Sequence, residues 1–269
     1  MLKHGAKADV KDAEGANALI IFGESSNGQH PAMDVRIVKA LLKAGAVPNI
    51  KDNAGRIPLL SWMNTSPHCV EPLIKGGADA KAMVGGHRTL LHQAAGSYRQ
   101  PAVSVRAVIV AGVAVDAVES DGNTALMTAG QIQGRWQNWG AMKRSEGEVE
   151  LIALLLDAGA NVNARNKSGE TPLMAWVEKT PESVAYLLKR GADLNARSHY
   201  GNTALALAAL WAPLDNVKLL VEAGAELNSV NEDGGTPLDR AGRNKNSQIA
   251  EYLKSLGAKT GAELKADEK

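Results

Sequence analysis

The sequence has little of several residue types that mark particular classes of protein. It holds one cysteine, Cys69, in 269 residues, which excludes a disulfide framework within the chain and is too few to hold a metal ion alone. Aromatic residues make up only 4%, with a single phenylalanine, Phe22. Alanine, leucine and glycine are plentiful, and cores of small residues and leucine suit closely packed helices better than β-sandwiches. The composition therefore favours a helical protein.

Neither the charge nor the hydropathy indicates a nucleic-acid or membrane protein. The net charge of +1 gives no field that would steer the chain to a polyanion or a membrane surface. No apolar run approaches the roughly 18 residues that cross a bilayer, and the first residues, MLKHGAKADV, lack the apolar core of a signal peptide. We therefore expect a globular protein of the cytoplasm.

A short string that begins with Gly, in most copies Gly-Ala followed by a polar residue, recurs along the chain. Its glycines are Gly5, Gly45, Gly77, Gly112, Gly159, Gly191, Gly224 and Gly257, at spacings of 40, 32, 35, 47, 32, 33 and 33 residues. A second signal, which begins nine or ten residues after each of the first seven glycines, reads EGANAL (14–19), AGRIPL (54–59), GHRTLL (86–91), DGNTAL (121–126), SGETPL (168–173), YGNTAL (200–205) and GGTPL (234–238). Two markers with one period indicate an internal repeat.

Each part of the repeat has a physical interpretation. In SGETPL, Thr171 can cap a helix and Pro172 suits the first helical position. The segment ESVAYLLKRG (182–191) has helical spacing of apolar residues and ends at Gly191, which suits a left-handed helix end. A unit of helix, turn, helix and extended loop cannot bury its apolar face alone, so we expect the units to stack into a solenoid.

These motifs resemble the ankyrin-repeat family, whose unit has about 33 residues and a TPLH-x-A signature. The resemblance implies an all-α solenoid over residues 1–258, with one partial and seven degenerate repeats, and a polar, frayed tail over 259–269. The signature histidine remains only as His92, for which the family implies a hydrogen bond to the backbone near Thr89, and His87 stands where the third turn glycine is expected. The repeats are 1–11 (partial), 12–50, 51–82, 83–117, 118–164, 165–196, 197–229 and 230–258.

The chain begins inside a unit, because residues 1–5 read as the end of a second helix. Either residues 1–15 are an abbreviated cap or a longer protein was cut here, and we favour the cut. A signal peptide upstream would then place the protein in the periplasm or outside the cell.

A larger period lies within the smaller one. Long, short and medium spacings occur twice, and Trp62 and Trp176 stand at matching positions where the family has a small alanine. We predict that a three-repeat block was duplicated, that the first member of each copy carries an insertion, and that both tryptophans are structural.

The sequence shows no catalytic constellation, cofactor motif or metal site. Its six histidines are scattered, and neither a phosphate-binding loop nor a dinucleotide fingerprint is present. We expect no enzyme and no cofactor.

A solenoid offers extended surface instead. The family register places Leu207 and Trp211 on the exposed face of a first helix, with Arg240 and Arg243 at comparable places in the next repeat. An apolar anchor beside arginines is typical of an interface hot spot. The alternative is that Trp211 folds over the turn that follows it.

Two other surfaces are candidates. The loop tips Arg165, Lys167, Arg197 and His199 form a modest basic spot. The predicted insertions, 23–33 and 130–148, should project from the opposite edge, and long loops are often functional. In the second, amphipathic rings stand with cations, a composition favoured in contact surfaces, although the rings can equally pin the loop to the solenoid. Its candidate contacts are Arg135, Trp136, Trp139, Lys143 and Arg144.

The sequence therefore predicts a non-catalytic module that binds another protein through a rigid surface and inserted loops. The alternatives are an inhibitor or immunity-type protein that blocks a partner enzyme, and a small-molecule or nucleic-acid binder, for which the basic signal is faint.

Overall fold

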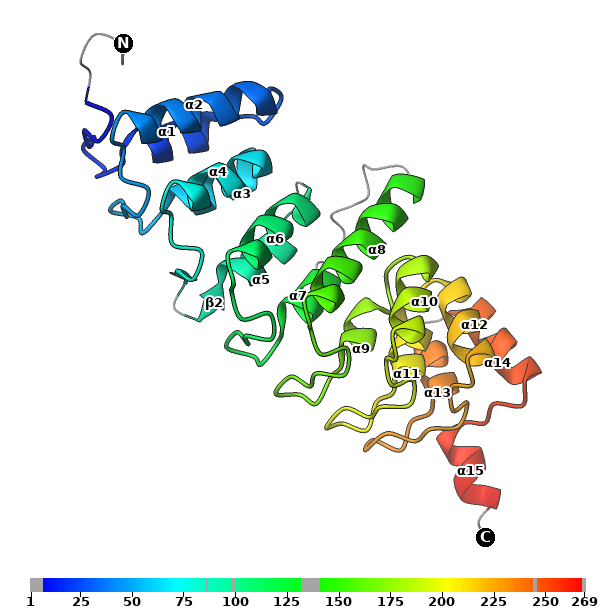
Figure 1. Ribbon diagram of the computed structural model, residues 1–269. Helices are drawn as coiled ribbons and strands as arrows, with labels where there is room; N and C mark the ends of the chain where they lie inside the picture. Colours follow the sequence, from blue (N-terminus) through cyan, green and yellow to red (C-terminus); the bar gives the residue numbers. More distant parts are fainter. Residues whose placement is uncertain (1–6, 86, 98–99, 132–140, 244–245, 268–269) are drawn as a thin grey trace. The chain divides into compact units, whose positions relative to one another are not determined.

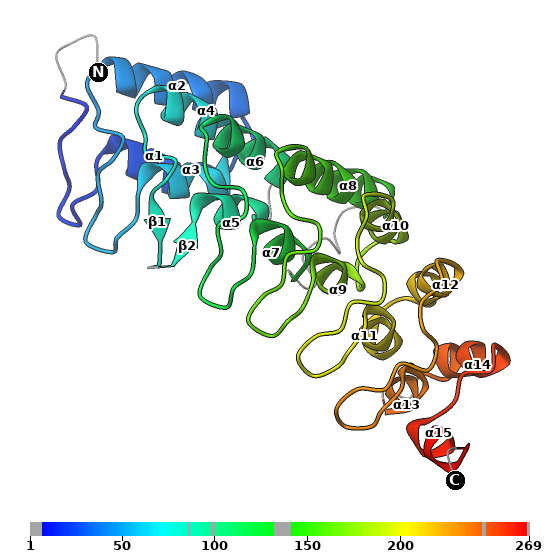
Figure 2. The same cartoon turned by 60° about the horizontal axis from the view of Figure 1, so that its bottom comes forward.

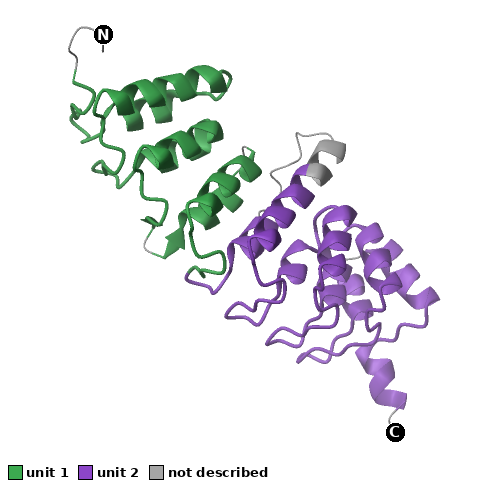
Figure 3. Cartoon of the chain, viewed as in Figure 1, with its two compact units in different colours: residues 1–119 green, residues 120–269 purple. Residues whose placement is uncertain are grey.

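The computed structural model describes residues 7–85, 87–97, 100–131, 141–243 and 246–267, with the side chains of 141–146 outside that description. The chain divides into two compact units, Met1–Glu119 and Ser120–Lys269 (Figure 3). Each unit repeats a pair of packed helices followed by a long loop. The border between them lies two residues inside the repeat predicted at 118–164.

In the described part of unit 1 the helices form three pairs. First helices pack on first helices and second on second, α1 against α3 and α2 against α4, which gives the steps of helix pairs in Figure 1. A short antiparallel hairpin joins Val84 to Arg88 in the repeat where His87 replaces the turn glycine. The elements are α1 (Ala18–Ser25), α2 (Pro31–Lys43), α3 (Pro58–Thr65), η2 (Pro67–Cys69), α4 (Val70–Lys75), β1 (Met83–Val84), β2 (Arg88–Thr89), α5 (Leu90–Ala95) and α6 (Pro101–Val110).

In the described part of unit 2 the pattern runs through four pairs and one further helix. The first helices form one row beside the long loops, and the second helices form another row (Figure 2). We call α7, α9, α11 and α13 the inner helices of unit 2. The elements are α7 (Ala125–Gln131), α8 (Ala141–Asp157), α9 (Pro172–Trp176), α10 (Pro181–Lys189), α11 (Ala204–Trp211), α12 (Leu214–Glu222), α13 (Pro237–Arg243), α14 (Ser247–Ser255) and α15 (Gly261–Asp267).

The repeated signals set where the helices begin and end, as predicted. The hydroxyl of Thr171 accepts a hydrogen bond from the amide of Met174 at 3.4 Å, and Pro172 opens α9. After α10, Gly191 has a φ of +89°, a left-handed conformation that a side chain would strain. Local signals therefore mark the start of α9 and the end of α10.

Two kinds of hydrogen bond tie successive loops of unit 2 together. At the tips, the amide of His199 donates to the carbonyl of Ser168 at 2.8 Å. Nearer the helices, the Oδ1 atom of Asn163 accepts from the amide of Asp193 at 2.8 Å, and Asn195 and Asn228 make the same bond one and two repeats later. These asparagines close the recurring glycine strings, so each repeat is joined to the next by its own motif.

Trp62 and Trp176 are core residues, with 0% and 1% of their surfaces exposed. The indole N–H of Trp62 donates to the carbonyl of Leu19 at 2.7 Å. In unit 2 the indole N–H of Trp176 donates to the carbonyl of Leu126 at 2.8 Å. The structural role predicted for both rings is confirmed, and their matching contacts support the duplication of a three-repeat block.

Among the described residues, both ends of each stretch predicted as an insertion are helical. In the first, 23–33, α1 continues to Ser25 and α2 begins at Pro31. In the second, 130–148, α7 continues to Gln131 and α8 begins at Ala141. The prediction of an inserted loop was therefore wrong for 141–148, because the additional residues extend α8 to 17 residues, against 9 in α10.

The prediction of a frayed tail was wrong for 261–267, which form α15. The amide of Gly261 donates to Oδ2 of Asp239 at 2.8 Å, and the hydroxyl of Thr236 donates to the carbonyl of Lys259 at 2.8 Å. Gly261 is buried against the loop before α13. The helix is held by the last repeat and covers part of it.

Candidate functional site

A groove of about 390 Å³ lies across three inner helices of unit 2. Gln131 at the end of α7 forms one side, Met174 of α9 lies in the middle, and Leu207 and Trp211 of α11 form the other side. The remaining lining residues are Gly130, Glu170, Ala175, Val177 and Glu178. The groove brings together the two apolar residues, Leu207 and Trp211, that the family register placed on the exposed face.

Trp211 is the most exposed aromatic residue at this groove, with 61% of its surface open to solvent. It is the last residue of α11, which ends because Ala212 takes an extended conformation, with φ −80° and ψ 161°, before Pro213. The ring is therefore largely open to solvent at the point where the chain turns. Leu207 lies one turn earlier on the same helix and is half-buried.

Two carboxylates stand at the groove. Glu178 lies two residues after the end of α9 and is exposed, whereas Glu170 precedes the cap of α9 and is half-buried. One oxygen of Glu170 accepts a hydrogen bond from Nδ2 of Asn166 at 3.0 Å. None of the described residues that line the groove is basic, so this surface is apolar with an acidic edge.

The predicted arginines, Arg240 and Arg243, belong to the next inner helix and do not line the groove. The guanidinium of Arg240 donates from Nη2 to Oδ1 of Asn202 at 2.6 Å. Burial, and then the charge of Arg243, lowers the pKa of Arg240. Arg240 is therefore engaged in the stack, whereas Arg243 is exposed.

The predicted basic spot at the loop tips is partly used inside the stack. The guanidinium of Arg165 donates to the carbonyl of Arg197 in the next loop, and Arg197 donates to the carbonyl of Val230 in the loop after it. Lys167 and His199 are exposed at the tips. The described groove contains none of these residues.

Of the candidate contacts in the second insertion, Arg135, Trp136 and Trp139 lie outside the described residues. Lys143 and Arg144 belong to α8, in the part whose side chains are likewise outside the description.

A comparison with family models matches this same region. The model for ankyrin repeats, in three copies, covers residues 140–231, which include both helices, α9 and α11, that carry most of the groove. Residues 140–231 are therefore ankyrin repeats, and the stacked helix pairs in both units fit an all-α ankyrin solenoid. A search of curated proteins found no match. Ankyrin repeats are generally protein-interaction modules and are typically not catalytic.

The ankyrin signature histidine keeps its local role here. Nδ1 of His92 lies 2.7 Å from the hydroxyl of Thr89, so the predicted bond near Thr89 is made to the side chain. His92 is fully buried. It serves the start of α5 and offers no catalytic surface.

One buried acid of the ankyrin stack, Glu148, was missed by sequence reasoning, which placed it at the end of the second predicted insertion. Glu148 is 2% exposed. One carboxylate oxygen accepts from the hydroxyls of Thr180 and Ser183, both at 2.7 Å, and from the amide of Thr180 at 3.2 Å. In unit 1 the acid Asp34 is also buried and accepts from the hydroxyl of Ser26 at 2.9 Å. The sequence offered one signal for this contact, because the string T-P-E-S at the start of α10 has the composition of a helix cap.

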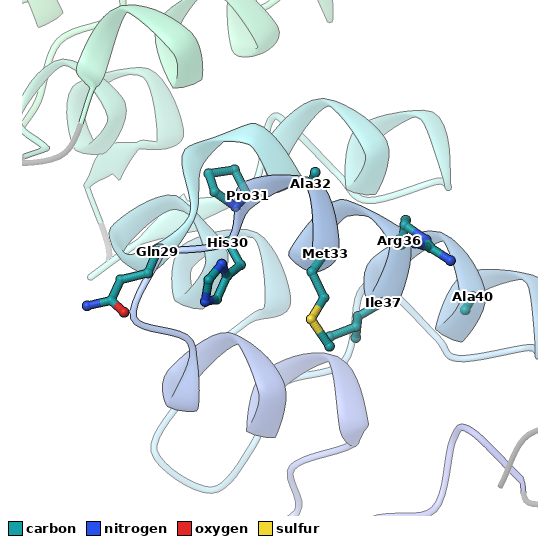
Figure 4. Close-up of a pocket in the computed structure, with 8 residues that line it drawn as sticks. All are labelled: Gln29, His30, Pro31, Ala32, Met33, Arg36, Ile37 and Ala40. Carbon is teal, nitrogen blue, oxygen red and sulfur yellow. The ribbon is translucent and has the colours of Figure 1, made fainter.

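A second groove, of about 900 Å³, runs along α2 in unit 1 (Figure 4). Met33 and Ile37 lie side by side on one flank of the helix, and Met33 is 61% exposed. The residues that line this groove come from α2 and the loop before it, and none of them is a predicted contact residue.

Other chemistry has little support in the ankyrin units. Nowhere in the described residues do three or more His, Cys, Asp or Glu side chains gather as a metal site requires. The helices in the described parts of the chain are too short or too polar to span a bilayer. Cys69 is fully buried, and burial raises the pKa of its thiol to about 12, against a smaller lowering by Ser66.

Proposed function

We propose that the protein binds a partner protein through the groove formed by Met174, Leu207 and Trp211, without catalysing a reaction. The observation that carries this proposal is the exposure of Trp211, at 61%. An exposed apolar ring at the end of an inner helix adds little to the packing between repeats, whereas Trp is among the residues most enriched in interface hot spots. The neighbouring Leu207 and the acidic edge supply the apolar and polar parts that an interface combines.

The repeat architecture supports recognition by a surface that is already formed. The inner helices are capped locally, and their loops are joined by the bonds of Asn163 and His199. Binding to such a surface orders few additional residues, so most of the contact energy remains available as affinity. In this proposal residues 1–258 act as one ankyrin domain, and 259–269 are its tail.

The remaining predicted contacts extend the proposed surface. The second insertion continues directly from Gln131, a residue of the groove, and Arg243 and the loop tips lie on neighbouring repeats of the same unit. The additional proposed contacts are Arg135, Trp136, Trp139, Lys143, Arg144, Arg165, Lys167, His199, Arg240 and Arg243.

The test is affinity capture with Trp211→Ala and a matched control. Tyr200 is 64% exposed, lies on a loop of the same unit and does not line the groove, so Tyr200→Ala removes an equally exposed ring elsewhere. We expect proteins captured by the unaltered chain to be retained by Tyr200→Ala and lost by Trp211→Ala. Equal capture by both variants would contradict the proposal. Far-ultraviolet circular dichroism verifies that both variants fold.

A further inference from the structure

The groove at Trp211 combines an apolar floor with a negatively charged edge. Met174, Leu207 and the Trp211 ring supply the apolar surface, and Glu170 and Glu178 supply two carboxylates. None of the described lining residues carries a positive charge. Two carboxylates beside a surface of low dielectric attract a cation and repel an anion, so the groove selects the charge of what enters it.

The two carboxylates differ in how they are held. The hydrogen bond from Asn166, at 3.0 Å, fixes one oxygen of Glu170. Glu178 is exposed, and in the described part of the chain no lysine or arginine forms an ion pair with it. The edge therefore offers one fixed acceptor and one that can turn toward a ligand.

The Trp211 ring adds a second preference for a cation. The face of an indole attracts a lysine or arginine head within about 6 Å. Both side chains also bury their methylene stems on apolar surface while the charged head stays in water. One long cationic side chain can therefore contact Leu207, cross the ring and reach Glu178. The two carboxylates would instead repel a phosphate or an acidic segment.

We infer that the occupant of the groove is an extended segment of a partner protein that presents a lysine or arginine beside an apolar residue. This inference rests on the proposed function, because it names the chemistry of the segment that the groove receives. The apolar residue packs on Met174 and Leu207, and the cation pairs with Glu178 across Trp211. A volume of about 390 Å³ is at the small end of ligand pockets and suits two neighbouring side chains.

A random peptide library displayed on phage, panned on the whole protein, supplies the probe. We expect enriched peptides to carry Lys or Arg next to Leu, Ile or Met. A selected peptide is then titrated by calorimetry beside a neutral twin, with norleucine for Lys or citrulline for Arg. The neutral twin should bind about fivefold more weakly. It should also lose most of the salt dependence, because screening acts on the charged pair.

Protein variants test whether Glu178 is the carboxylate that pairs with the cation of the peptide. Glu178→Gln should weaken the charged peptide by about fivefold and leave the neutral twin nearly unchanged. Glu182→Gln is the matched control, since Glu182 is an exposed acid on α10 that does not line the groove. Glu178→Lys should bind a peptide with Glu in place of the cation better than it binds the original.

The outcomes separate this inference from the proposed function. Peptides that need Trp211 but show no preference for a cation would overturn the inference and leave the proposed function standing. Peptides held equally well by Trp211→Ala, or a library without enriched sequences, would overturn both. A gain in affinity above about tenfold on Arg135→Gln would show that the chain's own insertion supplies the cation. The inference of a cationic segment from a partner would then be wrong.

Discussion

The ring of Trp176 occupies the space that a side chain on Gly130 would need. A Cβ at Gly130 would lie 2.6 Å from Cδ1 of Trp176 and 2.8 Å from the backbone oxygen of Ala175. The same relationship holds in unit 1, where a Cβ on Gly23 would lie 3.1 Å from Cδ1 of Trp62. In both units a tryptophan ring is therefore matched by a glycine in the first helix of the repeat before it.

This relationship predicts opposite effects for two glycine substitutions in unit 2. Gly130→Ala should destabilise the protein by about 2 to 3 kcal/mol, because neither the ring nor the backbone of α9 has room to move. Gly147→Ala should stabilise it by about 0.5 to 1 kcal/mol, because Gly147 is in α8 with nothing within 4 Å of its added Cβ. Urea unfolding followed by circular dichroism measures both. Equal effects of the two substitutions would contradict the packing described.

The buried acid predicts a second stability effect. Glu148→Ala should cost about 2 to 4 kcal/mol, because the hydroxyls of Thr180 and Ser183 lose their shared acceptor. Glu148→Gln keeps one accepting oxygen and should cost less. Glu182→Ala, an exposed acid on α10, should change stability by less than about 0.5 kcal/mol. A small effect of Glu148→Ala in the same unfolding experiment would mean that α8 and α10 are not joined through this carboxylate.

Much of this fold follows from the sequence because its signals are local. Each signal acts within a few residues. A threonine hydroxyl binds the amide three residues later, a proline occupies the first helical position, and a glycine follows the last turn. Thr171, Pro172 and Gly191 therefore take the predicted roles. The glycine strings also mark the asparagines, such as Asn163, although their bond to the following repeat is only visible once the loops are stacked.

The parts that sequence reasoning misjudged depend on contacts between distant residues. The stretch 141–148 contains glycine and many charges, yet it extends α8 and places Glu148 against α10. The tail forms α15 because Asp239 and Thr236 bind residues 259–261, and its own composition gives no sign of that contact. For Trp211 the sequence left two alternatives, a ring on the exposed face or a ring folded over the following turn, because its exposure depends on the turn at Ala212.

The lone cysteine gives a chemical prediction. Burial raises the pKa of the Cys69 thiol to about 12, so at about pH 8 it carries almost no thiolate, the reactive form. The native protein should react with a disulfide reagent at least about a hundredfold more slowly than the protein in concentrated urea. Absorbance of the released chromophore follows both reactions. Rapid labelling of the native protein would show that η2 opens readily.

The contact of α15 predicts a dependence on pH. Burial acts to raise the pKa of Asp239, but the hydrogen bonds from the amides of Thr236 and Gly261 outweigh it and hold the pKa below its usual 3.8. A carboxyl whose pKa is lowered in the folded state stabilises the fold above its usual pKa, and this contribution is lost as the pH falls through the lowered value. We therefore expect α15 to loosen only below about pH 4.

The amide resonance of Gly261, followed by NMR from neutral to acid pH, measures that release. Asp239→Asn is the control, since it removes the titrating group and should loosen α15 already at neutral pH. An amide of Gly261 that titrates identically in Asp239→Asn would assign the effect to another acid.

Binding at the groove is the central claim, and the indole N–H signals of the tryptophans test it most directly. Trp211→Phe assigns the signal of Trp211, and a library-selected peptide is then titrated into the labelled protein. The account predicts that the Trp211 indole signal moves with peptide concentration, while those of the buried Trp62 and Trp176 stay in place. A bound peptide that leaves the Trp211 signal unchanged would contradict it.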